Sequence, residues 1–207
     1  IADINAVLLA TNGVVTASKT DLASELVKLT NATSGKDALT LKVTNGAGVT
    51  ALQLSTLDGF TSVKVDASAV TAISGSAADL KKLVAAKGVE IAKGVNFEVS
   101  DLPGVNASDL ATILKSTLGI VTAANVTADT AAKLNAALTD KDVNALTLTV
   151  DGTTATAKDL ISLDGKTTAI TLNVGAITGN ITEITKVFVD DATHFTGVGA
   201  KAATISG

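Results

Sequence analysis

The chain has 207 residues, a net charge of −4 and no Cys, Met, Trp or Tyr, and Lys supplies all 16 of its basic residues. The negative charge and the absence of Arg argue against a nucleic-acid partner, because phosphate recognition needs clustered cations and guanidinium groups. A chain without Cys has neither disulfides nor thiolate metal sites, which suits an exported bacterial protein. Although 46% of the residues are apolar, no run of about 18 apolar residues occurs, so we expect no transmembrane segment.

The amino-terminal stretch, IADINAVLLATNG, contains no basic residue and lacks the features of a signal peptide. The first residue is Ile, not Met, which suggests a processed or excised segment of a larger protein.

Internal repetition dominates the rest of the chain. The phrase DALTLKVTNG at 37–46 returns as NALTLTVDG at 144–152, and TALQLSTLDGFT at 50–61 returns as TAKDLISLDGKT at 156–167. Repetition at a fixed period predicts a fold built from stacked copies of one unit.

The amino-terminal phrase DINAVLLATNGVVTA also matches DLATILKSTLGIVTA at 109–123, so the period is about 106 residues. We therefore divide the sequence into a first super-repeat copy, 1–107, and a second, 108–207. We expect the two copies to form one continuous solenoid.

Strands and helices alternate within each copy. The strand-like runs begin about 24, 24, 33 and 25 residues apart, and they lie at 14–18, 38–43, 62–67, 95–100, 120–124, 145–150, 169–174 and 202–206. Segments with a polar start and a Leu-rich face predict helices at 18–29, 74–86, 106–119 and 127–138.

This alternation predicts parallel strands joined by helical crossovers. We expect an α/β fold, a right-handed solenoid of leucine-rich-repeat-like architecture with about two super-repeats of four coils each. The alternative is a β-solenoid, in which the LDG segments at 57–59 and 163–165 are short strands and not helices.

Period-two alternation predicts which strand residues face the core. The inward set is aliphatic apart from one Phe: Leu39, Leu41, Val43, Val63, Val65, Val95, Phe97, Val99, Leu146, Leu148, Val150, Ile170, Leu172 and Val174. The outward set is small and polar: Thr40, Lys42, Lys64, Asp66, Asn96, Glu98, Thr147, Thr149, Thr171 and Asn173. One face of the sheet can therefore remain solvated.

Few residues carry chemistry. His194 follows Asp190 and Asp191 closely, and this spacing suggests a metal cluster, although the aligned segment KGVEIAKG of the first copy has no His and no paired Asp. The alternative is an ordinary capped loop.

Calcium is the one cofactor that we consider, because it commonly orders secreted bacterial repeats and prefers carboxylate oxygens. Asp140 and Asp142 stand at turns, and the candidate ligands are Asp58, Asp151, Asp164, Asp190 and Asp191. The alternative is that Asp merely favours turns, and no glycine-rich nonapeptide or EF-hand loop is present.

The stretch LSTLDG, followed by VKVDASAVTAISGSAADLKKLVAA, resembles the long repeat arrays of bacterial secreted and cell-surface proteins. Surface-layer proteins and large adhesins contain similar LDG, VDAS and ITGTAADV phrases. The resemblance implies an extracellular or cell-surface location, type I export with the signal beyond this segment, and a scaffold, lattice or adhesion role. It offers no catalytic residues to transfer.

We expect a structural surface protein that associates with itself through the ends or sides of the solenoid, and not an enzyme. The second hypothesis is an adhesin stalk or ligand-binding module that meets a cell-surface glycan, although sugars usually bind aromatic side chains and Trp and Tyr are missing. The remote alternative is a polysaccharide-active enzyme with Asp66 and Glu98 as a carboxylate pair on adjacent strands.

Overall fold

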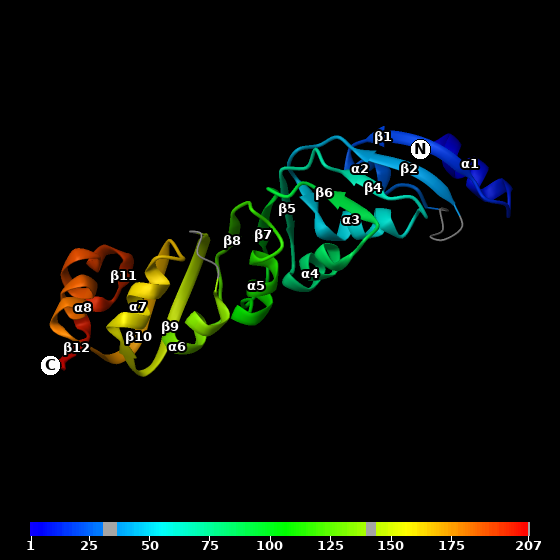
Figure 1. Ribbon diagram of the computed structural model, residues 1–207. Helices are drawn as coiled ribbons and strands as arrows, with labels where there is room; N and C mark the ends of the chain where they lie inside the picture. Colours follow the sequence, from blue (N-terminus) through cyan, green and yellow to red (C-terminus); the bar gives the residue numbers. More distant parts are fainter. Residues whose placement is uncertain (31–36, 140–143, 207) are drawn as a thin grey trace. The chain divides into compact units, whose positions relative to one another are not determined.

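The structure is a computed structural model, and it describes residues 1–30, 37–139 and 144–206. It has the predicted α/β class, with parallel strands and short helices (Figure 1). The chain forms two compact units, one made of residues 1–99 and 116–119 and the other of residues 100–115 and 120–207. No described helix has the length and apolar content needed to cross a bilayer.

The first unit contains two parallel sheets, with strand orders β1-β2-β4-β6 and β3-β5-β7. Its elements in chain order are α1 (Ala2–Ala10), β1 (Thr16–Asp21), α2 (Ala23–Leu26), β2 (Ala38–Val43), β3 (Val49–Thr50), α3 (Ala51–Asp58), β4 (Val65–Ala67), β5 (Ala72–Gly75), α4 (Ala77–Ala85), β6 (Val89–Ile91) and β7 (Asn96–Val99).

The second unit contains one parallel sheet in the order β8-β9-β10-β11, and β12 also pairs with β10. Its elements are α5 (Ala107–Leu114), β8 (Val121–Ala123), α6 (Ala131–Ala137), β9 (Ala145–Thr156), α7 (Ala157–Asp164), β10 (Ala169–Gly179), α8 (Ile181–Thr185), η1 (Lys186–Asp190), η2 (Ala192–His194), β11 (Phe195–Thr196), η3 (Val198–Ala200) and β12 (Ala202–Ile205).

Paired strand residues are separated by a nearly constant step in the sequence, from Thr16 opposite Ala38 to Ile177 opposite Ala203. The repeats β2–β3–α3, β4–β5–α4 and β6–β7–α5 each supply two strand positions and then a helix. In β9 and β10 both strand positions are joined in one long strand. Within the units, α3 packs on α4, and α7 packs on α6 and α8 (Figure 1).

Three short strands, β3, β5 and β11, were not predicted, whereas β7 and β12 match the strands expected at 95–100 and 202–206. β3 and β11 have two residues each and β5 has four, too few to show an alternating pattern. β6 was missed as well, and it lies inside the longest interval between the predicted strands. Because Val65 pairs with Val89, β6 restores the regular step between repeats there.

Two other expectations are wrong. The helix predicted at 18–29 is a strand as far as Asp21, and only Ala23–Leu26 are helical. The LDG segments are the ends of helices α3 and α7 and not strands, so the β-solenoid alternative does not hold.

Polar caps begin most of these short helices. Ser76 accepts a hydrogen bond from the Asp79 amide at 3.1 Å, and Thr50 and Gln53 form a capping box. Asn106, Thr130, Thr156 and Asn180 cap α5, α6, α7 and α8 in the same way. Helices this short are not stable alone, so caps and packing must hold them.

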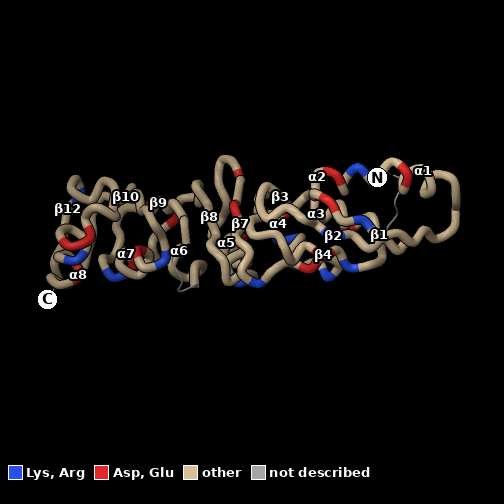
Figure 2. Tube along the Cα trace, turned by 90° about the horizontal axis from the view of Figure 1, so that it is seen from above, with Lys and Arg blue, Asp and Glu red and all other residues tan. Residues whose placement is uncertain are grey.

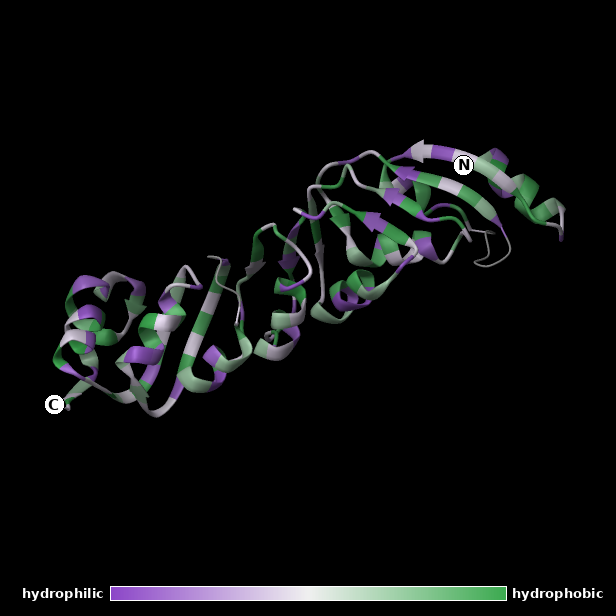
Figure 3. Ribbon diagram, in the orientation of Figure 1, coloured by the Kyte–Doolittle hydropathy of each residue, from purple (hydrophilic) through white to green (hydrophobic). Residues whose placement is uncertain are grey.

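The strand residues predicted to face the core are buried, except Val63, which is half-buried. Alternating apolar and polar residues along β2 and β9 are visible as colour bands in Figure 3. The predicted outward set is exposed, apart from half-buried Asp66 and Thr149. The core is therefore a column of Leu, Val and Ile beneath a polar sheet surface.

Among the described residues, four buried side chains are polar or charged: Asp37, Thr61, Asn144 and Thr167. Thr61 Oγ1 donates to the carbonyl of Leu39 at 2.7 Å and accepts from the amides of Leu39 (2.9 Å) and Val63 (3.0 Å). Thr167 Oγ1 donates to the carbonyl of Leu146, which is the equivalent contact in the second copy.

Asp37 and Asn144 form the second recurring pair. The amide of Val15 donates to Asp37 Oδ1 at 3.0 Å, and the amide of Val121 donates to Asn144 Oδ1 at 2.9 Å. A carboxylate in one copy and a carboxamide in the other accept the same backbone hydrogen bond. The hydrogen bonds of the Thr61/Thr167 pair to carbonyl groups and those of the Asp37/Asn144 pair all connect neighbouring repeats.

Replacing Thr61 with Val should lower the free energy of unfolding by about 1–3 kcal/mol, because two buried backbone groups of Leu39 lose their partner. Thr61→Ser keeps the hydroxyl and should cost less. Thr40→Val on the exposed face of β2 is the matched control, and urea unfolding followed by circular dichroism measures all three. Equal stabilities of the Thr61→Val and Thr40→Val variants would contradict this role.

Candidate metal centre

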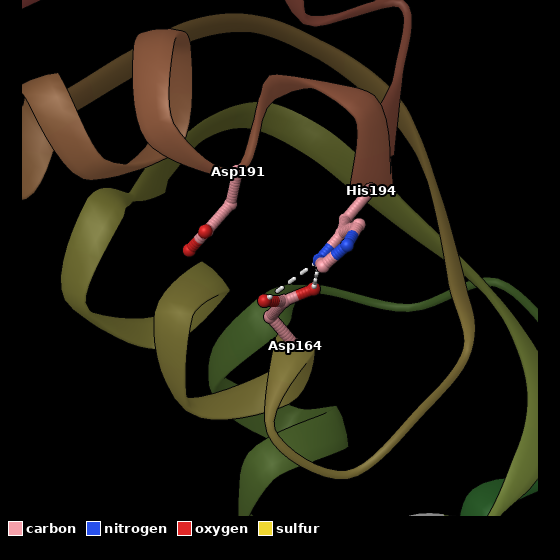
Figure 4. A group of neighbouring side chains, drawn as sticks. All are labelled: Asp164, Asp191 and His194. Carbon is pink, nitrogen blue, oxygen red and sulfur yellow. Dashed lines mark hydrogen bonds and ion pairs between the residues drawn. The ribbon is translucent and has the colours of Figure 1, made fainter.

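Asp164, Asp191 and His194 form the group in the described chain whose ligand atoms could hold a metal ion, and these atoms lie within 4.8 Å of one another. Asp164 is the last residue of α7, Asp191 follows η1 and His194 ends η2. The two segments are distant in sequence and meet because α7 packs against η1 (Figure 4).

Two side-chain contacts are formed in and beside this group, one between His194 and Asp164 and one between Lys186 and Asp191. His194 Nδ1 lies 3.1 Å from Asp164 Oδ1 and 3.2 Å from Asp164 Oδ2. Lys186 Nζ donates to Asp191 Oδ1 at 3.0 Å. The hydrogen bond to Asp191 raises the pKa of Lys186, and the charges of Asp190 and Asp164 act in the same direction. The ammonium group is thus a resident counter-ion of the cluster.

The exposure of the side chains decides how accessible the cluster is. The carboxylates of Asp164 and Asp191 are 17% and 15% exposed, whereas His194 is 57% exposed. One imidazole nitrogen with two carboxylates suits zinc or another first-row ion better than calcium, which takes six to eight oxygen ligands. Lys186 would compete with an ion for Asp191 Oδ1.

Sequence reasoning had placed Asp190 and Asp191 with His194. The structure brings Asp191 to His194 but places Asp164 there in place of Asp190, whose side chain is exposed within η1. The parallel stacking of α7 against the following repeat is the signal that could have identified Asp164.

The remaining predicted calcium ligands lie elsewhere. Asp151 Oδ1 accepts from the amide of Gly152 and from the side chain of Asn173, both at 2.9 Å. Asp58 ends α3 in the first unit. Asp140 and Asp142 fall outside the described residues.

Asp58 is the repeat equivalent of Asp164, and the residue that faces it differs between the two copies. A Cβ on Gly88 would overlap Asp58 Oδ1, so the carboxylate occupies the space above this glycine. Gly88 precedes Val89, which pairs with Val65, just as His194 precedes Phe195, which pairs with Ile170. The second copy therefore has an imidazole where the first copy has a glycine.

The carboxylate pair expected of an enzyme is not formed. Asp66 on β4 lies opposite Lys42 and Glu90, whereas Glu98 on β7 lies opposite Ser74 in the other sheet of the first unit. Hydrogen bonds from Ser68, and then from Lys42, lower the pKa of Asp66 to about 2. Asp66 is thus held as a carboxylate and is unsuited to act as a general acid. The prediction of adjacent strands is wrong because each repeat has two strand positions.

A hollow of about 360 Å³ lies on the second unit between residues 103–104, 124–128 and the strand β9. Pro, Gly, Ala, Asn, Val and Thr line it, and none of these residues titrates. It offers no acid, base or nucleophile beyond the hydroxyls of Thr127, Thr147 and Thr149. Lys and acidic residues are interspersed in both units (Figure 2).

Comparisons with protein-family models, with curated proteins and with solved structures find no match to this chain. The repeat and the geometry of its side chains are therefore the basis for assigning a function.

We expect the contact between His194 and Asp164 to stabilise the second unit modestly, as partly exposed ion pairs do. A double-mutant cycle with His194→Ala and Asp164→Asn should give a coupling energy of about 0.2–1 kcal/mol. The cycle is measured by urea unfolding at a pH where free imidazole is protonated. Strictly additive effects would mean that the two side chains do not interact.

Stability should also depend on Asp66 at acidic pH. Its folded pKa of about 2 lies below the ordinary value of 3.8, so its contribution is present above pH 3.8 and is lost as pH falls through 2. The difference in melting temperature between wild type and Asp66→Asn should therefore shrink between pH 4 and pH 2. Thermal scans measure it, with Glu98→Gln as the control for removing an exposed carboxylate. A difference that stays constant over this range would contradict the assignment.

Proposed function

We propose that the chain is a structural repeat module of an extracellular or cell-surface protein. In this proposal the repeats form a right-handed α/β solenoid, and copies of the chain associate through its ends or sides into a lattice, sheath or filament. The catalytic role that Asp66 and Glu98 would have required has no support from their positions in separate sheets.

The constant register is the observation that carries the proposal. Parallel partners recur at nearly the same step in both units, and the same buried Thr and Asp or Asn contacts recur a super-repeat apart. Repeats that contact mainly their neighbours build an elongated scaffold whose surface, and not a pocket, meets partners. Such an architecture is better suited to bearing load, holding other parts at a fixed spacing or assembling with other copies than to catalysis.

Composition supports the extracellular location. A chain with no Cys crosses an export channel without disulfide errors, and the phrases LSTLDG and VKVDAS resemble secreted repeat arrays. The polar Thr and Asn residues of the outward strand face keep a large sheet surface soluble.

An adhesin stalk is the second candidate, because the outward face of the second unit carries Thr149, Thr171 and Thr196 in register on three strands. These hydroxyls could meet a glycan. The absence of Trp and Tyr makes this the weaker candidate, because sugars usually stack on aromatic rings.

Negative-stain electron microscopy of the purified chain over a range of concentrations tests the proposal. We expect ordered sheets or filaments. Parallel samples with calcium and with a chelator test whether the turn aspartates take part, because a bound calcium ion would neutralise their negative charge and favour close contact between acidic chains. Isolated particles under every condition would contradict self-assembly and favour the adhesin stalk.

A further inference from the structure

We propose that Asp164, Asp191 and His194 bind a zinc ion or another first-row divalent cation, which fastens helix α7 to the segment after η1. This binding site goes beyond the structural role proposed above and does not require copies of the chain to associate. Three observations support it: the positions of the ligand atoms, the charge around them and the contrast with the first copy.

The ligand atoms are close to the spacing that zinc requires. Zinc bonds of about 2.0–2.2 Å to nitrogen and oxygen put two ligand atoms of a tetrahedral site roughly 3.4 Å apart. His194 Nδ1 lies 3.1 Å from Asp164 Oδ1, and the ligand atoms of all three residues lie within 4.8 Å of one another (Figure 4). A small movement of the Asp191 side chain would therefore complete a site with three protein ligands, and the exposed side of His194 leaves room for water as the fourth.

The charge around the cluster favours a cation, because both carboxylates lie at the C-terminal ends of helical segments: Asp164 ends α7 and Asp191 directly follows η1. The carbonyl groups at such ends carry partial negative charge, which attracts cations and disfavours carboxylates. Lys186 Nζ donates to Asp191 Oδ1 at 3.0 Å. The charges of Asp164 and Asp190 also act on this ammonium group. One ammonium group thus faces three carboxylates, and a divalent cation would balance the excess negative charge.

The first copy lacks the imidazole and so provides a comparison within the same chain. Asp58 ends α3 as Asp164 ends α7, but its carboxylate faces Gly88. His194 is the one histidine of the sequence, and the sequence has no cysteine. Because zinc prefers nitrogen and sulfur ligands, we expect it to bind in the second copy and not at Asp58.

Lys186 is the internal competitor of the ion, because its ammonium group is hydrogen-bonded to Asp191. Lys186→Met keeps the aliphatic part of this side chain and removes the ammonium group. The variant should bind zinc several-fold more tightly than wild type, because Asp191 is released and a like charge beside the ion is removed. Unchanged or weaker binding by Lys186→Met would mean that Asp191 is not a ligand, and would overturn the three-residue site.

Isothermal titration calorimetry with zinc at pH 7.5 tests the proposal on the whole chain without an affinity tag, since a polyhistidine tag would itself bind the metal. Wild type should show a single saturable site. His194→Ala and Asp164→Asn should each weaken binding at least about tenfold, because even the loss of a residue that only orients a ligand typically costs that much. Asp58→Asn is the matched control: it removes a carboxylate from the equivalent helix end and should bind zinc like wild type. Circular dichroism confirms that all variants are folded.

Nuclear magnetic resonance locates the bound ion, because a single imidazole gives a single set of ring signals. These signals should shift as zinc is added and reach saturation together with the calorimetric heat. Calcium at the same concentration should leave them unchanged, because calcium takes oxygen ligands. Zinc binding without a shift of the imidazole signals, equal binding by His194→Ala and wild type, or no saturable binding by wild type would each overturn the proposal. Failure of copies to assemble would overturn the proposed function alone.

Discussion

This fold depends on side chains that form hydrogen bonds with buried backbone groups near the start of a repeat. Where a helix returns the chain to the sheet, amides and carbonyls must find partners within an aliphatic core. Thr61 satisfies both groups of Leu39, and Asp37 accepts the amide of Val15. Because a hydroxyl or carboxyl group reaches only the adjacent repeat, these contacts fix the step between repeats, while the aliphatic column tolerates exchange of Leu, Ile and Val.

Much of this arrangement could be predicted from the sequence. Alternation in ALTLKV and ALTLTV identified the buried faces of β2 and β9, since a long strand repeats its signal. The strand β3 could not be predicted, because Val49–Thr50 is too short to show a period and is held by its neighbour in the sheet. Because β5 and β6 were also missed, the strands at 62–67 and 95–100 were taken as neighbours, which placed Asp66 and Glu98 on adjacent strands.

The candidate metal centre shows the same limit. His194 and Asp191 are neighbours in sequence and were identified together, but Asp164 reaches them only through the stacking of repeats. Its first-copy counterpart, Asp58, faces Gly88 in place of an imidazole. Both copies therefore carry an acid at this position, and the residue that faces it is a glycine in the first copy and a histidine in the second.

The constant step of the repeat has a consequence for the size of the molecule. Adding or removing one whole repeat of about two dozen residues would preserve the phase of the buried hydroxyls and of the aliphatic column, and would change a sheet by one strand spacing of about 4.8 Å. The step between paired residues already varies from 22 (Thr147 to Ala169) to 26 (Ala176 to Ala202), so differences in length fall outside the paired strand residues. The number of repeats in such a protein therefore sets the width of its sheet in steps of one strand.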